Sequence, residues 1–198
     1  MFFIYRILIN LIILISPFII LVRLINNKED KNRFKEKFCF FSKKRDDGKL
    51  IWFHGSSVGE ILSIIPLIEK FEKRKSINKI LVTSSTLSSS KVLSKFKFKK
   101  TIHQFFPIDS DSLTKKFLNY WKPSIAIFIE SEIWPNMIIN IKRKSIPLVL
   151  LNARITKKSY NRWNNIISTS KALFSNFDIC LSQNQETREY LKHLGASK

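Results

Sequence analysis

The stretch Ile125-Ala126-Ile127-Phe128-Ile129-Glu130 decides the fold. Five apolar residues, rich in β-branched side chains, run without interruption and end at a carboxylate. A half-exposed strand would alternate apolar and polar residues, so this run predicts a strand that is covered on both faces. Strands of this kind are typical of parallel sheets flanked by helices. The stretch therefore indicates an α/β protein, with Glu130 at the carboxyl end of a central strand.

Similar short apolar runs alternate with longer stretches that carry apolar residues at three-to-four spacing, and this alternation predicts βα units. We expect strands at residues 50–54, 80–83, 101–106, 124–129, 148–151 and 178–181. The expected helices are 60–73, 88–96, 112–120, 135–144, 160–174 and 186–194. Together these elements predict one Rossmann-like domain over residues 49–198, a parallel sheet with flanking helices.

Residues 1–25 are almost wholly apolar and predict a membrane anchor helix, followed by a basic connector at 26–48. About 20 apolar residues cross a bilayer as a helix, so the segment could span. It could also lie in the interface, with Arg6 and Arg23 reaching toward water at its ends. A cleaved signal peptide is the third option, but no small-residue cleavage site follows the apolar run. Retention as an anchor is favoured, and the basic flank after it indicates a cytoplasmic globular part.

The chain has a formal net charge of +20. Such an excess points to a polyanionic neighbour, whether nucleic acid, an anionic membrane surface or a phosphorylated substrate. A general bias toward Lys is an equally good explanation. Helix-turn-helix, RRM and zinc-finger patterns are absent from the sequence, which argues against nucleic acid. The two cysteines, Cys39 and Cys180, show no metal-ligand spacing and suggest neither a zinc site nor a disulfide framework.

Ligands of open α/β sheets bind beyond the carboxyl ends of the strands, and the first loop of interest is His54-Gly55-Ser56-Ser57-Val58-Gly59-Glu60. Two of the four glycines of the chain lie in it, which suggests a tight turn or the close approach of a ligand. The N–H groups at the start of the following helix could hold an anion. Ser57-x-x-Glu60 is also a capping-box pattern, which stabilises a helix start without any catalysis. From spacing alone, capping is the favoured role of Glu60.

Two further loops carry polar groups at strand ends. In Glu130-Ser131-Glu132-Ile133-Trp134-Pro135-Asn136, a buried strand end is a costly place for the charge of Glu130 unless it is paired or used. Glu132 has a simpler explanation as an acid that complements a helix dipole. In Asn152-Ala153-Arg154, the arginine could bind phosphate or carboxylate, or pair with Glu130.

Several nearby polar or aromatic side chains have a structural interpretation that is simpler than a functional one. The stretch 83–90 is interpreted as a polar turn and helix cap. The other residues interpreted as structural are His54, His103, Trp121 and Trp134.

Taken together and in order, these loops resemble the N-terminal domain of the Kdo transferase family, which transfers 3-deoxy-D-manno-octulosonic acid. The resemblance extends from the apolar N-terminus to the last residue. It is carried by His54-x-x-Ser57-Val58-Gly59-Glu60, a Thr83/Thr86 loop, Pro107-x-Asp109, Glu130-x-Glu132-x-Trp134-Pro135-Asn136, Asn152-Ala153-Arg154 with Ser159, and Gln183-Asn184 with Leu194-Gly195-Ala196.

The resemblance implies the N-terminal, acceptor-binding half of a GT-B glycosyltransferase that moves Kdo from CMP-Kdo to a lipid A precursor, lipid IVA, in lipopolysaccharide biosynthesis. It implies Glu60 as the proton acceptor of an inverting reaction and Glu130 as a transition-state stabiliser. Substrate-binding roles are implied for Ser57, Gly59, Thr86, Asn152 and Arg154. No metal or other cofactor is implied, and the setting is the cytoplasmic side of the bacterial inner membrane.

Two departures from the family pattern stand out. Ser89 occupies a position where the family has glycine, and the nucleotide-binding domain that the resemblance implies is absent from the sequence. We therefore expect either a fragment of a longer gene product or a truncated chain that is inactive alone. The alternative function is a non-catalytic, membrane-tethered module that binds lipid or anions.

Overall fold

The structure is a computed structural model that describes residues 2–196, so residue 1 and residues 197–198 of the expected segments lie outside it. Six parallel strands form a single sheet in the order β3-β2-β1-β4-β5-β6. Their bounds are β1 Leu50–His54, β2 Lys79–Ser84, β3 Thr101–Phe105, β4 Ile125–Ile129, β5 Leu148–Ala153 and β6 Ile179–Ser182. This is the doubly wound order of a Rossmann-like sheet. The predicted α/β class is confirmed, with every expected strand present and bounds that differ by one or two residues.

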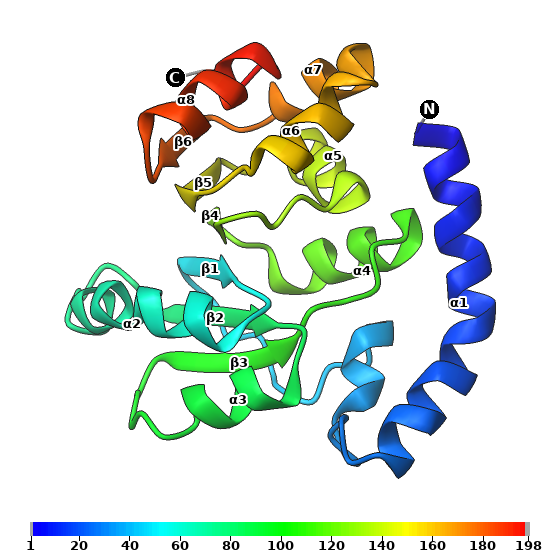
Figure 1. Cartoon of the computed structure of the whole chain (residues 1–198). Coiled ribbons are helices and arrows are strands. Elements are labelled where there is room, and N and C mark those ends of the chain that lie inside the picture. The colour runs from blue at the N-terminus through cyan, green and yellow to red at the C-terminus, as the bar shows by residue number, and fades with distance from the viewer. Residues whose placement is uncertain (1, 197–198) are drawn as a thin grey trace.

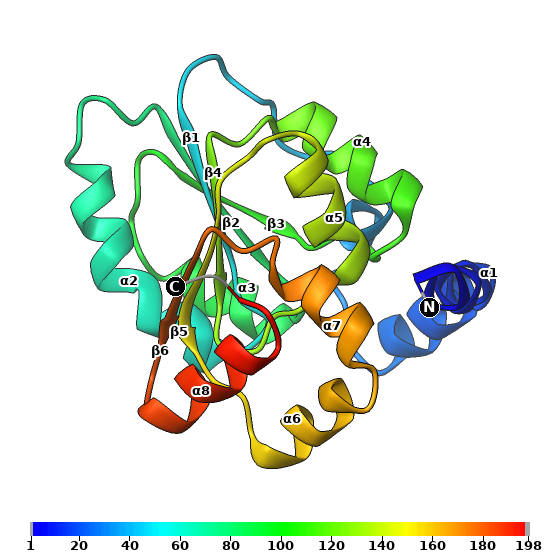
Figure 2. The same ribbon diagram turned by 90° about the horizontal axis from the view of Figure 1, so that it is seen from above.

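Helices cover both faces of the sheet, as the view from above shows (Figure 2). Side chains of β1 alternate between the two faces, so Trp52 enters one apolar cluster and Phe53 the other. The first cluster packs against α4 (Asp111–Trp121), α5 (Pro135–Arg143), α7 (Ile167–Phe174) and α8 (Gln185–His193). The second packs against α2 (Val58–Glu72) and α3 (Leu87–Leu93). β4 is covered on both sides, as its uninterrupted apolar sequence predicts.

One expected helix is wrong. The stretch 160–174 forms two helices, α6 (Lys157–Asn164) and α7, separated by a break at residues 165–166. Thr156 caps the start of α6 by accepting a hydrogen bond from Ser159 N, so that helix begins earlier than expected. Ser170 Oγ donates to the carbonyl oxygen of Trp163 at 2.6 Å across the break. Asparagine and β-branched residues have low helix propensity, and they fill the sequence at this point.

The connector at 26–48 folds onto the domain and contains a short 3₁₀ helix, η1 (Phe34–Phe38). Glu36 is buried, and its carboxylate accepts from both Nε and Nη2 of Arg33 at 2.9 Å. The same carboxylate accepts from Phe105 N at 2.9 Å. The connector therefore fixes the end of β3 through a buried ion pair.

The apolar N-terminal segment forms one long helix, α1 (Phe2–Ile25), which is the one helix within residues 2–196 long and apolar enough to cross a membrane. It runs beside α4 at the margin of the molecule and stands outside the helix layers that cover the sheet (Figures 1 and 2). Most of its surface faces outward.

Candidate active site at the switch point of the sheet

The polar loops meet where the strand order reverses, between β1 and β4. These two strands are hydrogen-bonded neighbours, with His54 in register with Phe128. β1 continues into α2, and β4 continues into α5, so the two helices leave on opposite faces of the sheet. Ligands of this fold bind at the carboxyl edge where neighbouring strands diverge in this way. The loops that carry Glu60 and Glu132 lie at this edge.

Glu60 is fixed in the first turn of α2 by reciprocal hydrogen bonds. Ser57 is the N-cap, and its Oγ accepts from Glu60 N at 3.2 Å while donating to Glu60 Oε1 at 2.8 Å. Ser56 N donates to Glu60 Oε2 at 2.8 Å. The capping interpretation is confirmed. The carboxylate is only half-buried, so the cap holds it in a defined position while leaving it accessible from outside.

Glu132 accepts more hydrogen bonds than would be expected of an acid that only complements a helix dipole. Its Oε2 accepts from Ser56 Oγ at 2.7 Å and from Trp134 Nε1 at 2.6 Å. Nε2 of His54, a fully buried side chain, lies 2.9 Å from the same oxygen. Although burial raises the pKa of Glu132, the bonds from His54, Ser56 and Trp134 bring it below its usual value. Glu132 is therefore an anion at neutral pH.

The interpretations of His54 and Trp134 as purely structural are incomplete, because both hold a carboxylate of the site. On the other side of the imidazole ring, Nδ1 lies 3.0 Å from Thr83 Oγ1. The signal in the sequence is a histidine at the end of one strand and a Glu-x-Glu pair at the end of its neighbour.

The neighbouring carboxylates affect the protonation of Glu60. Its pKa lies above the ordinary value near 4.5, chiefly because the side chain is partly removed from water. The negative charges of Glu132 and, more weakly, Glu130 raise it further, whereas the hydrogen bonds from Ser57 and Ser56 oppose the rise. A carboxylate with a raised pKa is a stronger base, and its proton exchange moves closer to neutral pH.

Glu130 and Asn152 have left-handed backbones with φ of +56° each, at the ends of adjacent strands. Glu130 N donates to the carbonyl oxygen of Leu151 at 2.9 Å, and Arg154 N donates weakly to the carbonyl oxygen of Glu130 at 3.4 Å. Of the two alternatives for Arg154, pairing with the Glu130 side chain is not found, because within the described residues no ion pair joins the two and their contact is between backbone atoms. The Arg154 side chain is exposed and faces solvent.

The two glycines of the Glu60 loop serve different purposes. A Cβ added at Gly55 would lie 3.0 Å from Cβ of Glu60 and 3.4 Å from its Oε2. The close approach of the carboxylate therefore requires a residue without a side chain at position 55. A Cβ added at Gly59 would meet only Ser57 Oγ, at 3.9 Å. No group within the described chain requires a glycine at position 59, and the space beside it is open to a ligand.

The Thr86 loop supports the Glu60 loop from β2. Thr86 is the N-cap of α3, where its Oγ1 accepts from Ser89 N at 3.2 Å. The polar-turn and cap interpretation of this stretch is confirmed. Ser89 Oγ donates to the carbonyl oxygen of Ser56 at 3.0 Å. Ser89 therefore supplies a hydroxyl that a glycine would lack. This hydrogen bond positions Ser56, which contacts both Glu60 and Glu132.

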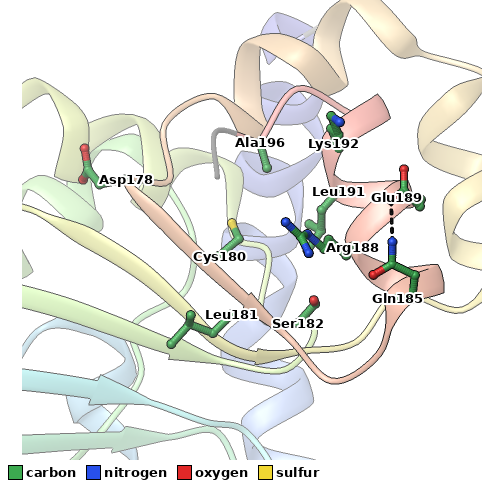
Figure 3. Close-up of a pocket in the computed structure, with 10 residues that line it drawn as sticks. All are labelled: Asp178, Cys180, Leu181, Ser182, Gln185, Arg188, Glu189, Leu191, Lys192 and Ala196. Atoms are coloured by element: carbon green, nitrogen blue, oxygen red, sulfur yellow. Dashed lines mark hydrogen bonds between the residues drawn. The ribbon is translucent and has the colours of Figure 1, made fainter.

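A cavity of about 1100 Å³ lies elsewhere, along the edge strand β6 and helix α8 (Figure 3). Its walls are mainly apolar, with Cys180 and Leu191 pointing inward and Gln185 bonded to Glu189 at 2.8 Å. Nothing in it combines a fixed base with an anion-binding helix start. The carboxylate loops at the switch point are therefore the candidate site. Among the described residues, no three His, Cys, Asp or Glu side chains are grouped to hold a metal ion.

Comparisons with known proteins agree on one family. A family model described as 3-deoxy-D-manno-octulosonic-acid transferase matches residues 32–198. A 3-deoxy-D-manno-octulosonic acid transferase of Rickettsia bellii is 40% identical over 179 residues, covering 90% of this chain and 43% of the relative. A probable mitochondrial transferase of the same name from Arabidopsis thaliana is 37% identical over 198 residues, covering 96% and 44%.

A more distant relative with this name, from Haemophilus influenzae, is 25% identical over 169 residues, covering 85% of this chain and 40% of its own length. The chain thus spans less than half the length of the curated relatives it matches. The matched region includes every loop of the candidate site and the strands that carry them. The chain belongs to the 3-deoxy-D-manno-octulosonic acid (Kdo) transferase family.

Proposed function

We propose that this chain is the membrane-anchored, acceptor-binding half of a GT-B glycosyltransferase that transfers Kdo from CMP-Kdo to a lipid A precursor, lipid IVA. The observation that carries the proposal is Glu60: an accessible carboxylate, fixed by a helix cap at the switch point, with a raised pKa. Family membership supports the transferred sugar. The specific donor, the acceptor and the bacterial inner membrane, with the domain on its cytoplasmic side, belong to the proposal.

Glu60 acts as the general base. It accepts the proton of a sugar hydroxyl on the acceptor while that oxygen attacks the anomeric carbon of Kdo. The new C–O bond forms as the bond to CMP breaks, and CMP leaves with the electron pair of that bond. Attack from the face opposite to CMP inverts the configuration. General bases of this kind contribute about 10²- to 10⁴-fold in rate when they are held within hydrogen-bond reach.

The other residues of the site bind substrate or stabilise charge. Positive charge develops on the sugar ring as CMP departs, and the carboxylate of Glu130, at the adjacent strand end, stabilises it. Arg154 supplies an exposed guanidinium suited to a phosphate group of the acceptor. The open space at Gly59, at the start of α2, offers a second anion contact. Ser57, Thr86 and Asn152 line the same edge. No metal takes part in the proposed step.

The test measures transfer from CMP-Kdo to lipid IVA by the chain joined to the part of its relatives that it does not cover. Glu60→Ala should lower kcat by at least about 100-fold. The melting temperature should fall modestly, because the variant also loses the acceptor of the hydrogen bonds from Ser57 and Ser56. Glu69→Ala is a matched control, because Glu69 is an exposed glutamate on the same helix. Normal turnover by Glu60→Ala would contradict the assigned base. Lipid binding without transfer by the unmutated protein would favour a non-catalytic lipid- or anion-binding module.

A further inference from the structure

One side of helix α1 has reduced exposure from Tyr5 to Leu24, whereas the rest of its surface is exposed. The side chains with reduced exposure recur every three or four residues and form one stripe about 100° wide on a helix of 3.6 residues per turn. The stripe begins at Tyr5 and ends at Leu24, with Arg6, Ile9, Ile13, Ser16, Ile20 and Arg23 between them. Ser16 and Ile20 are the most buried of the set, at 4% and 6% exposure. A helix that left the domain to cross a bilayer would contact it at one end only.

The first turns of α1 are tied to the domain by polar contacts. Tyr5 OH donates to Asp109 Oδ2 at 2.7 Å. Arg6 donates from Nε to Asn136 Oδ1 and from Nη2 to Asp111 Oδ1, both at 3.1 Å. Asp109 is itself buried and accepts from Asn136 N at 3.0 Å. These contacts join residues more than 100 positions apart in the sequence.

The last turn of α1 is tied down as well. Arg23 Nε donates to Glu29 Oε1 at 2.6 Å, and Glu29 is only 3% exposed. Lys37 Nζ donates to the same oxygen at 2.6 Å, linking this end of the helix to the connector. A helix of 24 residues is about 36 Å long. Both ends are therefore held by one domain, and a spanning arrangement would carry the charged groups of α4 and α5 into hydrocarbon.

The opposite side of α1 is a continuous apolar surface, here called the outer face. Its thirteen large apolar side chains are between 42% and 77% exposed: Phe3, Ile4, Ile7, Leu8, Leu11, Ile12, Leu14, Ile15, Phe18, Ile19, Leu21, Val22 and Ile25. Soluble monomers rarely leave so large an apolar patch uncovered. Three exposed lysines, Lys28, Lys31 and Lys35, follow directly after the helix. Apolar side chains beside exposed cations match the boundary between acyl chains and anionic headgroups.

We propose that α1 lies in the plane of a membrane with anionic lipids, its outer face immersed at the headgroup–acyl boundary and its inner stripe docked on the domain. This inference deepens the membrane attachment of the proposed function and rests on it for the lipid setting, but it does not require Kdo transfer. Arg6 bonds directly to Asn136, four residues after Glu132, so the docked helix holds the carboxylate loops at a fixed distance from the lipid surface. An acceptor anchored in the same leaflet would then reach Glu60 without leaving the membrane.

The test compares the depth of four labels on the outer face. Ile4, Leu11, Phe18 and Ile25 are spaced by seven residues, lie on one side of the helix and are at least half exposed. Each is replaced by cysteine in turn, in the chain with Cys180→Ser, and carries a fluorophore. Cys39 is buried and stays in place. The probe is quenching by lipids brominated at known depths, in vesicles of phosphatidylcholine and phosphatidylglycerol.

All four labels should report a similar, shallow depth, about 5–10 Å below the headgroups. A spanning helix would put Leu11 and Phe18 near the bilayer centre and Ile4 at the far interface, and that profile would overturn the proposal. Labels that remain as exposed to water with vesicles as without them would overturn it too. So would labels shielded in the absence of lipid, because a second copy of the chain would then cover the outer face. The depth profile does not depend on activity, so its failure and that of the proposed function are distinguishable.

Two further measurements separate docking from simple hydrophobic insertion. The double variant Tyr5→Phe/Arg6→Gln should change the depth of the Ile4 label and leave the Ile25 label unchanged, whereas Asn10→Ala, an exposed polar position of the same helix, should change neither. If the Ile4 label kept its depth in the double variant, the contacts of Tyr5 and Arg6 with the domain would not be what sets the depth of the helix. Removing phosphatidylglycerol should weaken vesicle binding by roughly 100-fold, as expected for three lysines near an anionic surface. Equal binding to pure phosphatidylcholine would contradict the choice of anionic lipid.

Discussion

Nε2 of His54 lies 2.9 Å from Oε2 of Glu132, and this contact joins the end of β1 to the loop that follows β4. Ser56 Oγ donates to the same oxygen, while Ser56 N donates to Glu60. One residue therefore connects the two carboxylates. Glu132 is the anion that organises the site, and Glu60 is the carboxylate free to exchange a proton.

Glu132→Gln should shift the acidic limb of the pH–rate profile to lower pH. In the proposed reaction Glu60 must be ionised to accept a proton, so activity should be lost as the pH falls through its pKa. The charge of Glu132 raises that pKa. Removing the charge at constant shape lowers the pKa of Glu60, and activity persists further into acid. The measurement is kcat/KM against pH in the proposed transfer assay. An acidic limb that stays in place would show that Glu132 does not influence the base.

Ser57→Ala should shift the same limb in the opposite direction. The Ser57 hydroxyl donates to Glu60 and lowers its pKa, so its loss raises that pKa and activity falls at a higher pH. The helix cap is lost as well, which costs about 0.5–2 kcal/mol of stability. Ser57→Thr keeps a hydroxyl and should restore both the profile and the melting temperature. A Thr variant that behaves like Ala would argue against the hydroxyl as the cause.

The two glycines of the Glu60 loop should respond differently to alanine. Gly55→Ala forces a methyl group against Cβ of Glu60 at 3.0 Å, so the carboxylate must move, and kcat should fall. Gly59→Ala meets only open space. Because alanine favours a helix more than glycine does, the melting temperature of this variant should be unchanged or slightly raised. Any loss of activity should appear in KM for the acceptor. Melting curves and steady-state kinetics of both variants separate the outcomes, and an equal loss of kcat in both would contradict the distinction.

The periodic features of the sequence predicted the fold well. The uninterrupted apolar run of β4 and the alternation of strands and helices depend on local patterns, and every strand appeared within two residues of its expected position. The break between α6 and α7 was missed because the apolar spacing over residues 160–174 is that of one helix, although residues 164–167 are poor helix formers. The bond from Ser170 to the Trp163 carbonyl then joins the two helices across the break.

The site was predicted in part. Glu60, with its cap, follows from the Ser57-x-x-Glu60 spacing, and the structure brings the Glu132 loop to the same edge of the sheet. The roles of His54 and Trp134 could not be predicted, because both contact Glu132 across a strand pairing or a loop turn that exists only in the folded chain. Of the two alternatives for Arg154, pairing with the Glu130 side chain is not found among the described ion pairs, because strand order does not determine the rotamers of either side chain.

The buried pair of Arg33 and Glu36 should be unequal in its response to mutation. Glu36 has a side chain that is 1% exposed, whereas that of Arg33 is 24% exposed. Arg33→Ala leaves a buried carboxylate without its counter-ion and should cost about 3–5 kcal/mol. Glu36→Gln keeps the shape and an acceptor oxygen, and the guanidinium still donates to the carbonyl oxygen of His103 at 2.7 Å, so its cost should be smaller. Urea unfolding of both variants measures the two costs, with Lys31→Ala as a control at an exposed site of the same connector. If Glu36→Gln cost as much stability as Arg33→Ala, or more, the prediction would be wrong. The guanidinium, and not the buried carboxylate, would then be the group that depends on its partner.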